Sequence, residues 1–212
     1  MSLHPSFPYR LYLVISEKDC LGKDLIRVAE QAILGGVDII QLREKDCSDH
    51  LFLQNAQRLK ELTDKHNIPL IINDNTEVAK KADAEGIHVG NNDTPPLILK
   101  QDPFFRNKIV GYSIEYLHQL ESENTLLSDY LGISPVFRTP TKNDTVTEWG
   151  IQGIEKIRSL TDKPLVAIGN INLGNAKQII KAGADCIAVV SAICAAPDPQ
   201  KAAWQLKNKI LQ

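Results

Sequence analysis

The sequence contains no block of lysine or arginine, no closely spaced pair of cysteines and no long apolar run. Its 212 residues carry 24 basic and 26 acidic side chains, for a formal net charge of −2. This balance argues against the strongly basic surface of a nucleic-acid-binding protein. The longest apolar stretches are too short to span a bilayer, and residues 1–5 do not have the pattern of a signal peptide. We therefore expect neither a nucleic-acid nor a membrane partner.

Cysteine is scarce, and its spacing does not match that of a metal site. The four residues Cys20, Cys47, Cys186 and Cys194 form no CxxC motif. This pattern argues against a zinc site or a disulfide framework, so we expect a reducing, cytoplasmic location. Hydrophobic residues make up 43% and charged residues 24% of the chain, which is typical of a globular protein.

Short runs rich in valine and isoleucine recur along the whole chain, with helical spacing between them. The runs are residues 11–15, 37–41, 70–73, 86–89, 109–113, 130–133, 164–168 and 186–190. Similar phrases at 35–38, 82–86 and 182–185 predict junctions of one design between a helix end and a strand. The alternation, with no linker, favours a compact single-domain (β/α)8 TIM barrel over residues 1–212. A doubly wound open sheet is the alternative.

Polar side chains alternate at the end of the second run. Gln41, Arg43 and Lys45 share one face of a strand because successive side chains point to opposite faces. A solvated strand end would accommodate any one of them. All three together, two of them cationic, predict a cradle for a polyanionic ligand.

Carboxylates follow the third and fourth runs. Asp74 or Asp93 alone is best interpreted as a helix N-cap. In a barrel, however, these strand ends are neighbours, and two adjacent carboxylates repel each other unless a cation lies between them. Mg²⁺ typically binds one or two carboxylates and completes its coordination shell with water and phosphate oxygens. Together with the cationic strand end, the pair predicts a Mg²⁺–diphosphate site.

A second anion site is expected on the opposite side of the barrel mouth. Loops after the seventh and eighth strands of such barrels often bind phosphate through backbone N–H groups, and Gly169 and Ser191 lie there. The histidines are weak catalytic candidates: His4 is expected in a tail, and His88 as a satisfied core residue. Cys47 and Cys194 are interpreted as incidental small residues, because no histidine partner is implied.

These motifs resemble those of the thiamine-phosphate synthases, in the same order and over nearly the whole chain. The matching segments are residues 41–45, 72–74, 88–90 with Asp93, 111–113, 132–137, 139–142, 167–169 and 190–193. The resemblance implies a Mg²⁺-dependent transferase that joins 4-amino-2-methyl-5-hydroxymethylpyrimidine diphosphate to a thiazole phosphate. The products would be thiamine phosphate and diphosphate, formed through a carbocation-like pyrimidine species without a strong general base.

The resemblance also implies roles for individual residues. Asp74 and Asp93 would bind Mg²⁺, and Arg43, Lys45, Ser113 and Lys142 would be catalytic. The pyrimidine diphosphate would contact Gln41, Leu42, Arg43, Glu44, Lys45, Asn73, Ser113 and Lys142. The thiazole phosphate would contact Thr139, Pro140, Thr141, Gly169, Asn170, Val190 and Ser191.

Two residues depart from the family pattern. Asn170 replaces a second glycine, and we expect the turn to survive because asparagine tolerates left-handed backbone. Glu115 replaces a histidine. The alternatives are a thiazole tautomerase, which tends to lack Asp74 and Lys45 equivalents, and a non-catalytic thiamine-precursor binding or regulatory protein. The sequence leaves open a homo-oligomer and the thiazole tautomer used.

Overall fold

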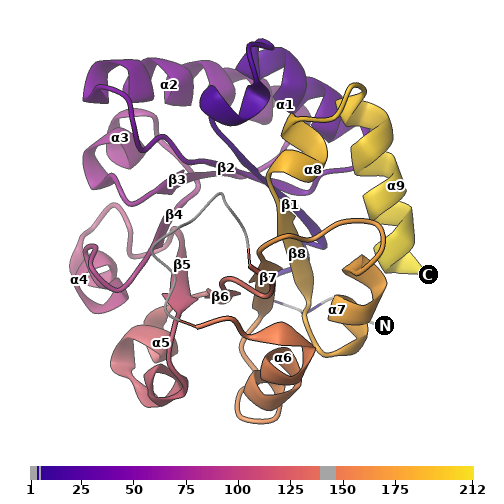
Figure 1. The fold of residues 1–212 in the computed structure, drawn as a ribbon. Coiled ribbons are helices and arrows are strands. Elements are labelled where there is room, and N and C mark those ends of the chain that lie inside the picture. The colour runs from indigo at the N-terminus through magenta and orange to yellow at the C-terminus, as the bar shows by residue number, and fades with distance from the viewer. Residues whose placement is uncertain (1–3, 5, 139–146) are drawn as a thin grey trace.

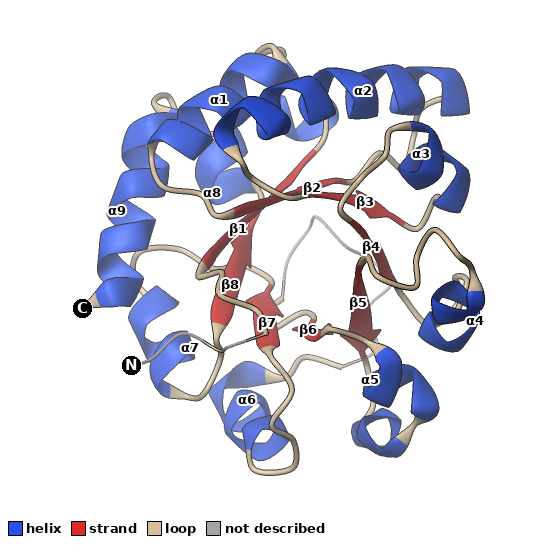
Figure 2. Ribbon diagram, turned by 180° about the vertical axis from the view of Figure 1, so that it is seen from behind, coloured by secondary structure: helices blue, strands red, loops and turns tan. Residues whose placement is uncertain are grey.

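Eight parallel strands close into a barrel in the computed structural model, which describes residues 4, 6–138 and 147–212. The strands follow one another in chain order, and β8 pairs with β1 to complete the ring. Figure 1 looks along the barrel and Figure 2 shows it from behind. The predicted (β/α)8 barrel is confirmed. The strands are β1 (Leu11–Ile15), β2 (Ile39–Leu42), β3 (Leu70–Asn73), β4 (Gly86–Val89), β5 (Ile109–Ile114), β6 (Tyr130–Ile133), β7 (Leu165–Ile168) and β8 (Cys186–Val189).

Helices surround the strands on the outside (Figure 2). Ser48 is the N-cap of the helix over Asp49–His66, because its Oγ accepts a hydrogen bond from Leu51 N. No helix in the described ranges combines the length and apolarity needed to cross a bilayer. The α-helices are α1 (Leu25–Leu34), α2 (Asp49–His66), α3 (Thr76–Lys81), α4 (Pro96–Gln101), α5 (Glu123–Leu127), α6 (Gly150–Arg158), α7 (Ala176–Lys181), α8 (Ser191–Cys194) and α9 (Pro199–Leu211), and the 3-10 helices are η1 (Lys18–Cys20) and η2 (Leu117–Glu121).

Apolar side chains fill two separate regions, because alternate residues of each strand point inward and outward. The larger core lies between the strands and the helices. The smaller one lies inside the barrel, where Phe7 packs 4.8 Å from the ring of Tyr130. His4, expected in a tail, instead donates a hydrogen bond from Nε2 to the backbone oxygen of Asp162 at 3.0 Å. The N-terminal segment therefore contacts the amino-terminal end of the barrel.

Four carboxylates hold the strands at this end. Each precedes an even-numbered strand, accepts a hydrogen bond from a backbone N–H at the start of the preceding odd-numbered strand, and pairs with a cation from a helix. Bonds to charged acceptors are stronger than neutral ones. The carboxylates are Asp38, Glu85, Asp129 and Asp185, their backbone donors are Leu11, Leu70, Val110 and Leu165, and their cations are Lys207, Lys60, Lys100 and Arg158.

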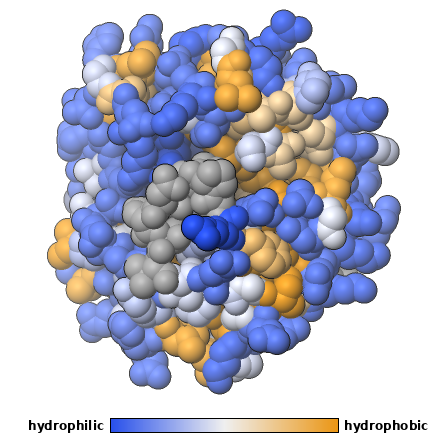
Figure 3. Space-filling view, viewed as in Figure 1, coloured by the Kyte–Doolittle hydropathy of each residue, from blue (hydrophilic) through white to orange (hydrophobic). Residues whose placement is uncertain are grey.

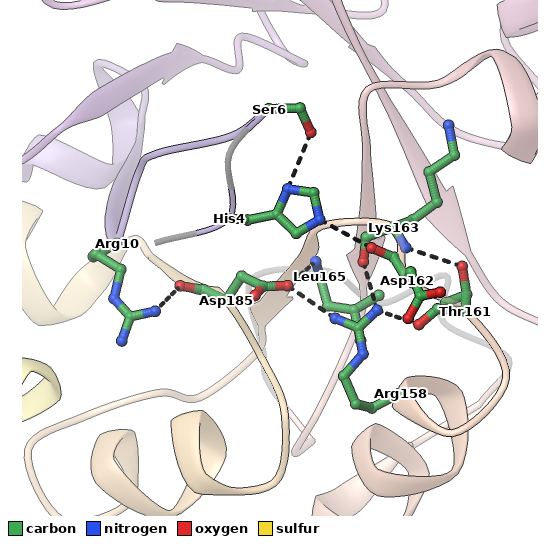
Figure 4. Close-up of polar contacts among 9 residues, drawn as sticks. All are labelled: His4, Ser6, Arg10, Arg158, Thr161, Asp162, Lys163, Leu165 and Asp185. Atoms are coloured by element: carbon green, nitrogen blue, oxygen red, sulfur yellow. Dashed lines mark hydrogen bonds and ion pairs between the residues drawn. The ribbon is translucent and has the colours of Figure 1, made fainter. Parts of the chain in front are cut away.

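Figure 4 shows the arrangement at Asp185. Its Oδ2 atom lies 2.9 Å from Leu165 N and 3.0 Å from Arg158 Nη1. Arg10 Nη1 donates to the backbone oxygen of Asp185 at 3.0 Å. The Asp185 carboxylate is largely buried, with 13% of its side chain exposed. Hydrogen bonds from Leu165 N and Arg158 therefore stabilise its negative charge in place of water.

We predict that Asp185→Ala lowers the free energy of unfolding by about 2–3 kcal/mol, since it removes the acceptor of a buried N–H and leaves Arg158 without its carboxylate. Urea denaturation measures this loss. Asp46→Ala is the control, because its ion pair with Lys18 is 72% and 81% exposed and should leave the midpoint unchanged. Equal midpoints for the two variants would contradict the role of Asp185.

Candidate active site

A cavity of about 700 Å³ opens at the carboxyl ends of the strands, within the usual size range for small-molecule sites. Residues from all eight strands or the loops that follow them line it. Figure 3 shows mostly hydrophilic side chains on this face of the molecule, with hydrophobic ones gathered over α8. The barrel thus places its polar cavity at the expected end.

The alternation predicted at the end of β2 is confirmed. Gln41, Arg43 and Lys45 all line the cavity. The intervening side chains point elsewhere: Leu42 is fully buried in the outer core, and Glu44 accepts hydrogen bonds from Glu17 N at 3.0 Å and from Asn55. Neither Leu42 nor Glu44 lines the cavity, so their predicted substrate contacts gain no support from side-chain placement.

Asp74 and Asp93 converge beside Lys45. Lys45 Nζ lies 2.5 Å from Asp74 Oδ2, and Asn73 Nδ2 donates to the same oxygen at 2.6 Å. Burial raises the pKa of Asp93, and the Asp74 carboxylate, within hydrogen-bond distance, raises it further. The juxtaposition that the sequence predicted is therefore present.

Neither aspartate is a helix N-cap, so that interpretation of the single residues is wrong. Asn75 caps α3 through Val78 N, and Pro95 precedes α4. Asp93 Oδ2 instead accepts a bond from Gly90 N at 2.8 Å, and Asp74 has left-handed backbone with φ of 60°. Backbone geometry therefore directs both carboxylates into the cavity rather than along a helix.

The described lining of the cavity carries more negative than positive charge. Its acids are Asp19, Asp74, Asp93 and Glu115, whereas its lysine and arginine side chains are Lys45 and Arg43. Over the described ranges, no cluster of three or more His, Cys, Asp or Glu side chains forms a protein-only metal site. A polyanion would need further positive charge beside the two aspartates in order to bind here.

A chain of hydrogen bonds forms the floor of the cavity. Gln41 Nε2 donates to Tyr12 OH at 2.9 Å, and Tyr12 OH lies 3.0 Å from Tyr130 OH. Tyr130 OH lies 3.0 Å from His88 Nδ1, and His88 Nε2 lies 2.9 Å from Ser113 Oγ. Both ring nitrogens of His88 have hydrogen-bond partners, as predicted, but the residue is half-buried and lines the cavity instead of lying in the core. The chain fixes both Gln41 and Ser113.

A glycine makes this floor possible. A Cβ atom at Gly111 would lie 2.2 Å from Tyr130 Cζ and 2.4 Å from His88 Nδ1, so no larger residue fits. Burial raises the pKa of both Tyr12 and Tyr130, and their hydroxyls remain neutral donors and acceptors. Tyr12 and Tyr130 lie in predicted strands but are not among the predicted site residues. Tyr12 alternates with Val14 in the first run, and this pattern could have assigned it to the interior of the barrel.

The opposite side of the cavity contains the glycine turn after β7. Gly169, Asn170, Val190 and Ser191 all line the cavity. A Cβ atom at Gly169 would lie 2.9 Å from Val136 N, and its φ is 118°. Asn170 has φ of 51°, so the expected left-handed asparagine is confirmed.

The remaining predicted residues lie at the end of β5 and in the segment after β6. Thr139, Pro140, Thr141 and Lys142 lie outside the described residues. Ser113 lines the cavity. Glu115 also lines it and accepts a hydrogen bond from Asn91 Nδ2 at 2.7 Å. Asp19, in η1, is a lining residue that no sequence signal indicated.

Comparisons with known proteins identify the family of this chain. A family model described as thiamine monophosphate synthase matches residues 11–193. The chain belongs to this family. A thiamine-phosphate synthase from Albidiferax ferrireducens is 44% identical over 205 residues, covering 95% of this chain and 91% of the relative. One from Vibrio campbellii is 43% identical over 198 residues, covering 93% and 96%.

A solved structure agrees with these relatives. Thiamine phosphate pyrophosphorylase from Pyrococcus furiosus has a TM-score of 0.85 and 30% identity to this chain, with 96% of each chain covered. A 3-hexulose-6-phosphate synthase shares the fold at 17% identity, with a TM-score of 0.68. The family resemblance drawn from the motifs is therefore confirmed.

We predict that Tyr130→Phe lowers the free energy of unfolding by about 1–3 kcal/mol, because it removes the buried hydroxyl that bridges Tyr12 and His88. Tyr9→Phe, near the amino-terminal end, is the matched control and should have a smaller effect. Guanidinium denaturation of both variants checks this. An undiminished stability of Tyr130→Phe would show that the floor network does not hold the site.

We predict that Gly169→Ala destabilises the protein more than Gly22→Ala. Both glycines have positive φ, but a Cβ atom at Gly22 would meet nothing within 4 Å. Left-handed strain should cost about 1–2 kcal/mol in both variants, and the clash at Gly169 should add about 1–3 kcal/mol. Thermal unfolding of the two variants measures the difference; equal losses would mean that the loop after β6 moves aside freely.

Proposed function

We propose that the chain joins 4-amino-2-methyl-5-hydroxymethylpyrimidine diphosphate to a thiazole phosphate, with Mg²⁺, at the cavity described above. The transferase activity is proposed because relatives named thiamine-phosphate synthase match more than nine tenths of the chain. The observation that carries the proposal for the site is the meeting of Lys45, Asp74 and Asp93 where β2, β3 and β4 end.

The donor set at this point fits Mg²⁺. Two carboxylates within hydrogen-bond distance of each other supply hard oxygen ligands, and Mg²⁺ typically completes its shell with water and phosphate oxygens. When bound by Asp74 and Asp93, the ion would supply positive charge beside the departing diphosphate. It would also offset the excess negative charge of the described lining.

The residues of the chain act on charge and position. Breaking the bond between the pyrimidine methylene carbon and the diphosphate oxygen leaves the electron pair on the diphosphate. Arg43 and Lys45 face the cavity, where they stabilise that charge. The ring nitrogen of the thiazole then bonds to the cationic methylene carbon. Gln41 and Ser113, held by the floor network, orient the pyrimidine for this step.

The thiazole phosphate is assigned to the other side of the mouth. Gly169, Asn170, Val190 and Ser191 line the cavity there, and left-handed backbone at Gly169 and Asn170 shapes the turn between β7 and α7. Thr139, Pro140 and Thr141 join this set by family resemblance, whereas Lys142 is assigned to the pyrimidine diphosphate. The two substrates would thus approach each other across the barrel axis, in a cytoplasmic enzyme.

The contact between Lys45 and Asp74 favours the transferase over a thiazole isomerase. Isomerisation of a thiazole phosphate releases no diphosphate, so it gives no reason to place two cations and two carboxylates on one side of the cavity. Isothermal titration with each substrate and Mg²⁺, followed by detection of thiamine phosphate and diphosphate, tests the proposal. Binding of both substrates without diphosphate release would contradict it, and conversion of the thiazole phosphate alone would indicate the isomerase.

We predict that Asp74→Asn lowers kcat by about 100-fold or more, because it removes a charge that holds the metal, with little change in unfolding free energy. Asparagine tolerates the left-handed φ of 60° at this position. Asp83→Asn is the matched control, since Asp83 also has positive φ and pairs with a lysine. Steady-state diphosphate release measures both variants, and equal rates would exclude Asp74 from the site.

A further inference from the structure

Two buried cysteines lie on neighbouring elements, η1 and α8, beside the cavity. Cys20 ends η1, in the loop after β1, and Cys194 ends α8, after β8. Neither residue is exposed to solvent. The two elements pack against each other, and Figure 1 shows α8 beside the indigo N-terminal part of the chain. The Cys20 and Cys194 side chains interact with each other, and both lie at the end of β1, where Cys194 Sγ is 3.7 Å from Val14 O and Cys20 N is 3.3 Å from Ser16 O.

The two sulfurs have different reactivity. The hydrogen bond from the Cys194 thiol lowers the pKa of Cys20, and burial opposes this shift without cancelling it. The same interaction, together with burial, raises the pKa of Cys194. Cys20 is therefore the better nucleophile, since the thiolate is the reactive form, and Cys194 is placed to resolve an oxidised Cys20.

The other two cysteines lack this arrangement. Cys47 lies in the loop after β2, where burial and the neighbouring Glu44 raise its pKa. Cys186 is fully buried in the core inside the barrel, where burial also raises its pKa. All four cysteines lie in the described residues, and Cys20 and Cys194 are the two whose side chains interact with each other. They therefore form the pair suited to crosslinking.

We propose that Cys20 and Cys194 form a reversible disulfide when the protein meets a peroxide. The Cys20 thiolate attacks one peroxide oxygen, the O–O bond breaks, and Cys20 becomes a sulfenic acid while hydroxide leaves and is protonated to water. The Cys194 sulfur then attacks the Cys20 sulfur, its proton and the departing hydroxide form a second water, and the S–S bond closes. The two sulfurs are oxidised and the peroxide is reduced; thiol–disulfide exchange with a dithiol restores both thiols.

Cys20 is buried but lies at the end of a short surface element. This element is a single 3-10 turn, and the next residue, Leu21, is 71% exposed. Cys20 N is held to the backbone oxygens of Ser16 and Glu17. Short elements with few backbone bonds open locally at low cost, which admits a molecule as small as hydrogen peroxide.

The crosslink would alter the cavity through α8. The two sulfurs must come to about 2 Å from each other in a disulfide, which pulls the end of α8 towards η1. Ser191 and Ala192, at the start of α8, line the cavity, as does Asp19 in η1. This consequence rests on the proposed thiazole-phosphate site, whereas formation of the disulfide does not.

The chemical test uses the full chain with hydrogen peroxide. Intact-mass spectrometry should show loss of two hydrogen atoms, reversed by dithiothreitol, and non-reducing peptide mapping should join the peptides of Cys20 and Cys194. Cys47→Ser is the matched control and should retain the crosslink, whereas Cys20→Ser should lose it. Addition of oxygen without loss of hydrogen, or a crosslink through Cys47, would overturn the proposal even in the wild-type chain.

Kinetics separate the two claims. Peroxide treatment of Cys47→Ser should raise the KM for the thiazole phosphate by about tenfold, as expected for weakening of one charge-assisted hydrogen bond, and dithiothreitol should reverse it. A mapped crosslink with unchanged KM would overturn the effect on the cavity. Absence of turnover in untreated protein would instead count against the proposed function and leave the mass result to decide the disulfide.

Discussion

The architecture depends on hydrogen bonds and ion pairs made by four carboxylates at the amino-terminal end of the barrel. Asp38, Glu85, Asp129 and Asp185 each accept a backbone N–H at the start of a preceding strand and pair with a helix cation. This arrangement repeats four times around one end of the barrel and ties strands to the helical layer. Because polar stabilisation is concentrated at the amino-terminal end, the carboxyl ends of the strands are left to carry reactive groups.

Strand alternation then decides which groups enter the cavity. Gln41, Arg43 and Lys45 point inward while Leu42 joins the outer core. Parallel pairing of β2 with β3 and of β3 with β4 brings Asp74 and Asp93 beside Lys45, although they follow different strands. The floor network holds Gln41 and Ser113 beneath them. The scaffold thus positions charged and polar side chains around one cavity.

The barrel and the charged side of its cavity could be predicted from the sequence because they follow from short-range periodicity. The similar segments at 35–38, 82–86 and 182–185 correctly predicted the junctions before β2, β4 and β8. The carboxylates in these segments accept hydrogen bonds from the start of the preceding odd-numbered strand, 15 or more residues earlier in the chain, and no local pattern reveals such contacts. Asp74 and Asp93 looked like N-caps for the same reason: only the chain path shows that Asn75 caps α3. Tyr12 and Tyr130 were missed because their pairing across the barrel depends on the space left by Gly111. The domain limits 1–212 and the roles of Thr139 to Lys142 remain predictions.

The proposed function requires Asp74 and Asp93 to hold a metal between their carboxylates and a diphosphate that faces Arg43 and Lys45. A crystal structure with the pyrimidine diphosphate and Mn²⁺, an oxygen-binding substitute for Mg²⁺, tests this arrangement by anomalous scattering. We expect one metal peak in contact with both aspartates and with diphosphate oxygens. A metal bound elsewhere, or a diphosphate seated beside Gly169 and Ser191, would contradict it.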